Sequence, residues 1–374
     1  MEKKTKDTNT YILVNLILLL IAFLLTLFIV IEYKMNKTNI VSSMSEQTNV
    51  IVSSIQAEKE TEKGTENTQV VVPVILDNNV PTNISTTNCY KYYYNQLDGT
   101  AKKIYNTIEN NIENIKSGTY VINLSDDITS VLNDSNGQEK LNIDFQSAWD
   151  AICLDRVDLF YIDISKITLK IKTITSGNNI KHYVSMQSYN NEGYLENGFQ
   201  NEQIVDMALS QVNNSRNEIV SSLSGNNYNK IMQAHDWLVD NVEYGTEKSG
   251  NNAYNIYGTF EVKSVVCEGY AETFKYIMDD IGIPCVLVSG TATNSEGTTE
   301  NHEWNYVQID GKWYGLDATW DDPIISGGGK LTKSLKYKYF LKGSEVMNKN
   351  HFPNGKISTS GITFTYPTIE SKDY

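Results

Sequence analysis

Apolar residues recur at helical intervals in several parts of the chain, and β-branched or alternating residues mark others. Helical spacing predicts helices over 101–115, 145–159, 201–222, 228–242 and 267–281. Strand patterns mark 161–164, 167–174, 182–188, 284–290, 302–309 and 312–318. This order predicts an α+β fold in which the helix after 267 packs on an antiparallel sheet. The helices and strands upstream form an accessory layer.

An uncharged run from Tyr11 to Ile31 is long enough to cross a bilayer as one helix. Lysines dominate the residues before it, which favours a cytoplasmic N-terminus and an extracellular remainder. A cleaved signal peptide is the competing interpretation, but the run exceeds a usual signal core and no small-x-small cleavage site follows it.

The segment after this run is rich in Ser, Thr, Asn, Glu and Lys and has one dense apolar patch at 70–76. Such a composition buries too little apolar surface to offset chain entropy, which predicts a disordered stalk. The expected organisation is a cytoplasmic tail (1–10), a transmembrane anchor (11–32), the stalk (33–88), an accessory α/β region (89–225) and a catalytic domain (226–374).

The composition and charge exclude one class of partner but do not identify the function. The net charge is −14 and the isoelectric point is about 4.8. A nucleic-acid partner is therefore not expected, since it requires a basic surface. Of the four cysteines, Cys285 lies in an apolar run and is expected to be a small core residue. A bridge between Cys89 and Cys153 is left open.

The candidate chemistry lies in three residues, Cys267, His302 and Asp317. Cys267 begins a predicted helix, where unpaired N–H groups and the helix dipole favour a thiolate. Gly269, within the same first turn, has no side chain and would allow close approach of a substrate backbone. An imidazole held by a carboxylate is the usual device for activating such a thiol.

The predicted hairpin brings the histidine and the aspartate together without any knowledge of relatives. If Asp310 and Gly311 form a two-residue type I′ turn, Ile309 pairs with Lys312 and Val307 with Tyr314. That register places Asp317 diagonally across from His302, within side-chain reach. It does not bring Cys267 to His302. A zinc site is a further alternative, but it usually has close ligand pairs such as C-x-x-C, which the chain lacks.

Several motifs resemble the core of the transglutaminase-like superfamily, in its bacterial cell-surface branch. They are VCEGYA at 266–271, GIP at 282–284, HEWN at 302–305, DGKWY at 310–314 and DATWDDP at 317–323. The resemblance covers about 226–323, and more weakly His235 and His351. It implies a papain-like α+β fold, with Cys267 as nucleophile, His302 as general base and acid, and Asp317 as the residue that orients it. No cofactor or metal is implied.

The chain departs from many relatives at Val266, where glycine is frequent, and at Glu303, where alanine is frequent. Both changes could alter the pocket. Tyr257 is a candidate side-chain donor for the oxyanion, with packing beneath the helix as its alternative role. His235 lies in an amphipathic helix and is expected to be structural.

The expected function is a membrane-anchored, extracellular cysteine hydrolase or acyltransferase. It would act on protein or peptide amides, with cell-wall peptides among the conceivable substrates, through a thioester. Hydrolysis and transamidation share that thioester, and water is the default acceptor. The alternative is a catalytically silent surface module that keeps the fold for binding.

Overall fold

The computed structural model describes residues 58–59, 90–117, 121–124, 126–189, 193–323 and 332–374, which all belong to one compact unit. The predicted tail, the anchor and nearly all of the stalk lie outside these residues. Within the described ranges, no helix combines the length and the apolar character that a membrane span needs.

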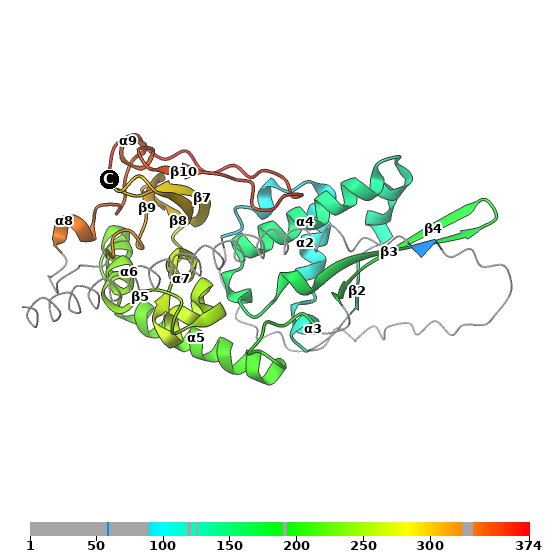
Figure 1. Ribbon diagram of the computed structural model, residues 1–374, viewed down its shortest axis with the longest axis horizontal. Coiled ribbons are helices and arrows are strands. Elements are labelled where there is room, and N and C mark those ends of the chain that lie inside the picture. The colour runs from blue at the N-terminus through cyan, green and yellow to red at the C-terminus, as the bar shows by residue number, and fades with distance from the viewer. Residues whose placement is uncertain (1–57, 60–89, 118–120, 125, 190–192, 324–331) are drawn as a thin grey trace, which may run out of the picture. The chain divides into compact units, whose positions relative to one another are not determined.

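The C-terminal half contains a four-stranded antiparallel sheet (Figure 1). Its strand order is β10 (His351–Pro353), β7 (Cys285–Thr293), β8 (Thr299–Ile309) and β9 (Lys312–Leu316). Helix α7 packs on β7 and β8 of this sheet.

Helix α7 (Cys267–Asp280) is enclosed by other elements rather than exposed on one side. Besides the sheet, it contacts α5 (Glu202–Ser222) and α6 (Asn227–Asn241). The consecutive residues 273–279 are all buried, which a helix shows only when it is covered on every side. The first residue of α7 is therefore held by the core of the molecule.

The accessory region contains a second sheet, in the order β1 (Glu58–Lys59), β3 (Ile167–Ser176), β4 (Asn179–Ser188) and β2 (Val121–Asn123). Its helices are α2 (Gly99–Glu109), α3 (Ile112–Lys116) and α4 (Gly137–Asp155). Helix α4 packs against both α2 and β7, so the accessory region shares its core with the C-terminal sheet.

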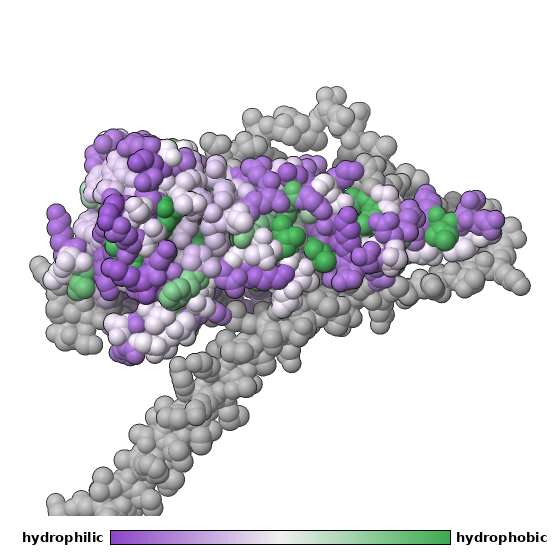
Figure 2. Space-filling model, turned by 90° about the horizontal axis from the view of Figure 1, so that it is seen from above, coloured by the Kyte–Doolittle hydropathy of each residue, from purple (hydrophilic) through white to green (hydrophobic). Residues whose placement is uncertain are grey.

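The remaining elements are short. They are η1 (Tyr94–Gln96), η2 (Asp126–Asn133), η3 (Val157–Leu159), η4 (Ile164–Lys166), β5 (Glu243–Tyr244), η6 (Gly250–Tyr254), the π-helical turn η7 (Gly258–Val262), β6 (Ser264–Val265), α8 (Lys333–Lys336) and α9 (Ser344–Met347). The surface seen in Figure 2 is mostly hydrophilic or neutral with small hydrophobic patches, as expected where most large apolar side chains are buried.

Most of the predicted elements are confirmed, and three predictions are wrong in detail. The predicted helix 101–115 breaks at Asn110 and Asn111 into α2 and α3, since asparagine favours helix ends over helix interiors. Helix α4 begins at Gly137, eight residues before the predicted start at 145. The missed first turn carries the exposed polar residues Gln138, Glu139 and Lys140, which give it little apolar periodicity.

The third wrong prediction is the strand at 161–164. Ile162 forms only an isolated bridge with Leu195, and η4 begins at Ile164. The Asp163 side chain accepts a hydrogen bond from the Ser165 N–H and caps that turn, a local interaction that competes with strand pairing.

The hairpin of β8 and β9 has the predicted turn and register. Asp310 (φ 50°) and Gly311 (φ 76°) both have positive φ, as a type I′ turn requires. Ile309 pairs with Lys312, and Val307 with Tyr314. Continued by one position, this register places Asp317, directly after β9, opposite Trp304 of β8 and diagonally across from His302.

Candidate active site

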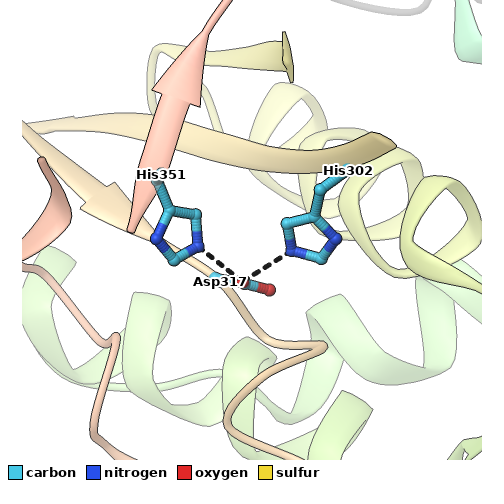
Figure 3. A group of neighbouring side chains, drawn as sticks. All are labelled: His302, Asp317 and His351. Atoms are coloured by element: carbon cyan, nitrogen blue, oxygen red, sulfur yellow. Dashed lines mark hydrogen bonds and ion pairs between the residues drawn. The ribbon is translucent and has the colours of Figure 1, made fainter. Parts of the chain in front are cut away.

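His302 and Asp317 form a buried hydrogen-bonded pair. His302 Nε2 lies 2.8 Å from Asp317 Oδ2, and the two residues are 6% and 1% exposed (Figure 3). The other carboxylate oxygen, Oδ1, accepts from the Trp320 N–H at 3.1 Å. Because Nε2 is engaged with the carboxylate, Nδ1 is the nitrogen of His302 left to face a nucleophile.

A second histidine binds the same carboxylate oxygen. His351 Nε2 lies 2.9 Å from Asp317 Oδ2, and Figure 3 shows both rings directed at it from different strands. The Nδ1 atom of His351 lies 2.9 Å from Asn350 Oδ1. Sequence reasoning noted His351 only as a weak resemblance, because three-residue β10 carries no local pattern and gains its place by pairing His351 with Ala292 of β7.

Aromatic rings enclose these groups and lower the local dielectric. Trp320 lies 5.1 Å from the His302 ring and 4.7 Å from the His351 ring, measured between centroids. Burial opposes a charged imidazole, but the charge and the hydrogen bond of Asp317 outweigh it and raise the pKa of His302. Burial favours the neutral form of Asp317, but the charges and hydrogen bonds of the two histidines outweigh it and lower the pKa of Asp317.

Cys267 is a free thiol at the first position of α7 and is 7% exposed. The N-cap residue Val266 provides no side-chain hydrogen bond, which leaves backbone N–H groups of the first turn available. The Glu303 backbone N–H lies close enough to the Cys267 sulfur to favour its thiolate form. The thiol therefore lies beside the residue that follows His302 on β8.

Two acidic side chains, Glu268 and Glu303, lie near the thiol. Cys267 Sγ donates to Glu268 Oε2 at 3.0 Å. Burial, and then the Glu268 charge, raise the pKa of the Cys267 thiol well above its ordinary value. Glu303 accepts from Ser289 Oγ at 2.9 Å, and burial together with the Glu268 charge raises the pKa of Glu303 to about 8. The departure noted at Glu303 thus places an additional carboxyl group beside the thiol.

Gly269 has a packing role in the first turn of α7. A Cβ atom on Gly269 would lie 2.5 Å from Cβ of Val265 in β6. The absence of a side chain therefore lets the first turn of α7 pack against β6.

The structure does not bring Tyr257 to the thiol. Its ring stacks on Phe160 at 5.6 Å and contacts Phe199 edge-on at 5.4 Å. Tyr244 and Tyr254 instead lie within electrostatic range of Cys267, whose charge contributes after burial to their raised pKa values. Tyr244 reaches this place because β5 pairs with β6, opposite Val265. That pairing of two-residue strands leaves no sequence signal.

His235 is connected to the Asp317 backbone through a series of hydrogen bonds. It is fully buried, and its Nε2 lies 3.1 Å from Asp321 Oδ2. Asp321 Oδ1 accepts from the Tyr339 N–H at 2.8 Å, and the Tyr339 carbonyl accepts from the Asp317 N–H at 3.2 Å. His235 thus stabilises the backbone that carries Asp317.

One group among the described residues has the composition of a metal site. The ligand atoms of His302, Asp317 and His351 lie within 4.8 Å of one another, and two histidines with one carboxylate are a common metal-binding set. Here the same atoms hydrogen-bond to each other. A metal in this position would occupy the nitrogen that holds His302 in its orientation.

Part of the chain is similar to a known family. Residues 215–318, which include Cys267, His302 and Asp317, match the model of the Transglutaminase-like superfamily. Kyphoscoliosis peptidase from Mus musculus is 26% identical over 169 residues, and that from Homo sapiens is 24% identical. The alignment covers 41% of this chain and 25% of each relative, so the chain spans about a quarter of their length.

Two solved structures show a partial likeness. A TGase is 12% identical, with a TM-score of 0.28 over 46% of this chain and 56% of that one. The periplasmic domain of TgpA from Pseudomonas aeruginosa is 14% identical, with a TM-score of 0.24 over 38% and 55%. The family-model match shows that residues 215–318, which hold the cysteine-bearing helix and the strands on which it packs, are similar to the transglutaminase-like superfamily.

Proposed function

We propose that the chain is a cysteine acyl-transfer enzyme that acts on protein or peptide amides, with Cys267, His302 and Asp317 as its catalytic residues. Hydrolysis is the favoured outcome, and the peptidase name of the curated relatives agrees with it. The observation that carries the proposal is the buried 2.8 Å contact between His302 and Asp317, on the strand whose next residue, Glu303, lies beside the Cys267 thiol.

The reaction begins when His302 Nδ1 takes the thiol proton and the sulfur attacks the amide carbonyl carbon. The negative charge on the carbonyl oxygen is stabilised by the free N–H groups at the start of α7, with the Tyr244 or Tyr254 hydroxyl as an added donor. His302 then protonates the amine as the carbon–nitrogen bond breaks, which leaves a thioester on Cys267. Water or an amine attacks the thioester and restores the thiol.

Mass analysis of the products tests this proposal. The full chain is incubated with a glutamine-containing peptide, with and without a primary amine. Cleavage or deamidation supports a hydrolase, and an amine adduct supports a transamidase. Cys267→Ala and His302→Gln are expected to abolish either product. Products that persist in both variants would remove these residues from the chemistry.

A catalytically silent binding module is the second candidate, and one observation favours it. In the resting geometry the thiol donates to Glu268, and its raised pKa opposes formation of the thiolate. Alkylation by iodoacetamide distinguishes the two functions. An enzyme should be labelled near neutral pH, and the labelling rate should fall in His302→Gln. A silent module should be labelled only at alkaline pH, at a rate that His302→Gln does not change.

The proposed location is the outer face of a cell membrane, with the N-terminus in the cytoplasm. The sequence of 11–32 supports this proposal through its length and its lack of charge. A location outside the cell would make extracellular or cell-wall peptides the accessible substrates.

A further inference from the structure

A cleft of about 490 Å³ opens beside the histidine pair. Trp320, Tyr339 and Asn350 line it, with Lys338 and Lys349 also on its wall. Its volume is within the range of sites that hold small ligands or a short peptide segment. Among the residues that the structure describes, no acidic side chain lines this cleft.

The charge of the cleft is opposite to that of the chain. The protein has a net charge of −14, yet the charged side chains of the cleft are two exposed lysines. Lys338 lies 5.0 Å above the Tyr339 ring. Within the described part of the chain, neither ammonium group is in an ion pair. Both are therefore available to a carboxylate ligand.

The position of the cleft indicates which part of a substrate it would hold. Trp320 lines the cleft and also lies against His302, at 5.1 Å between ring centroids. His302 has to deliver its proton to the departing amine, so the segment attached to that amine must pass the histidine. The cleft begins at the Trp320 ring, which lies next to His302.

The cleft is also connected to the histidine pair by hydrogen bonds. Asn350 Nδ2 donates to the Tyr339 hydroxyl at 2.6 Å, and Asn350 Oδ1 lies 2.9 Å from His351 Nδ1. His351 in turn contacts Asp317. A ligand that contacts Asn350 would therefore touch the network that orients His302.

We propose that this cleft binds the substrate segment that carries the leaving amine, and that Lys338 and Lys349 select segments that contain carboxylates. The assignment to the leaving-amine side rests on the proposed function. The preference of the cleft for carboxylates does not, and it can be measured without turnover.

Binding is measured with the full chain carrying Cys267→Ala, so that no reaction occurs. Three fluorescein-labelled pentapeptides are compared by polarisation at low salt: Ala-Gln-Gly-Glu-Glu, Ala-Gln-Gly-Gln-Gln and Ala-Gln-Gly-Lys-Lys. The acidic peptide should bind roughly tenfold more tightly than the neutral one, and the basic peptide most weakly. Added Lys338→Glu and Lys349→Glu should invert this order. Lys170→Glu, an exposed change on β3, should leave it intact.

Lysine acetylation locates the bound peptide. Lys338 and Lys349 should be protected by the acidic peptide while Lys170 is not. Equal affinities for the three peptides, an order that survives the double charge reversal, or the absence of protection would each overturn the proposal.

Turnover by the wild-type chain separates the two proposals. If the acidic peptide binds and protects the lysines but no peptide is processed, the proposed enzymatic function fails and the carboxylate-binding cleft stands. If cleavage occurs, acidic residues on the amine side of the cut should lower KM more than kcat. The same effect from residues on the acyl side would overturn the assignment of the cleft.

Discussion

Individual side chains set the reactivity of the thiol, and Glu268 has the largest influence among its charged neighbours. We predict that Glu268→Gln speeds iodoacetamide labelling of Cys267 at pH 7. The change removes the negative charge of Glu268, which raises the thiol pKa, and replaces the carboxylate acceptor of the thiol hydrogen by a weaker, neutral amide oxygen. Each unit of pKa decrease gives about tenfold more thiolate. Glu296→Gln, on the exposed turn before β8, is the control; equal rates in all three proteins would contradict the prediction.

The pair of His302 and Asp317 should make stability depend on pH in a defined window. The lowered pKa of Asp317 contributes stability that is lost as the pH falls below its unfolded value, near 4. The raised pKa of His302 contributes stability that is complete below about pH 6.5 and is lost as the pH rises through the folded value.

We therefore expect Asp317→Asn to lower the free energy of unfolding most between about pH 4 and 6.5. The loss should be of the order of 3 kcal/mol, as for other broken buried pairs. Urea unfolding of both proteins from pH 3 to 9 measures it. A difference that is constant with pH would show that the two charges do not interact.

Helices and strands position these side chains through close contacts such as that of Gly269 with Val265. Gly269→Ala should lower the free energy of unfolding by about 1–3 kcal/mol, because the added methyl overlaps Val265. Gly99→Ala in α2, where a Cβ meets nothing within 4 Å, is the matched control and should be neutral or slightly stabilising. Equal effects in thermal unfolding would rule out the packing role.

Local patterns predicted α7, the β8–β9 hairpin and the contact of His302 with Asp317. A two-residue turn fixes which residues of the two strands lie opposite each other, and so which side chains are in reach. Local patterns did not predict His351 or Tyr244, which reach the site through strands of two or three residues paired with distant segments. Nor did they predict the first turns of α4, where exposed polar residues at 138–140 leave little apolar periodicity.

The whole chain has a feature that the described residues do not include, the uncharged run from Tyr11 to Ile31. We predict that the full chain sediments with membranes, resists extraction by high salt and is released by detergent. Deletion of 1–32 should make it soluble, while deletion of 35–55 should not. Release by salt alone would contradict an anchor, and a mature N-terminus after Ile31 would show a cleaved signal peptide.

The turn at Asp310 and Gly311 has a consequence for how the molecule assembles. Only a short loop separates the imidazole from the carboxylate that holds it, so closing that loop has a small entropic cost and hairpins form within microseconds. The sulfur joins them only when α7 docks on the finished sheet. In the proposed enzyme, a folding chain would therefore pair His302 with Asp317 before the thiol joins them, and would be protected from acylation until folding is complete.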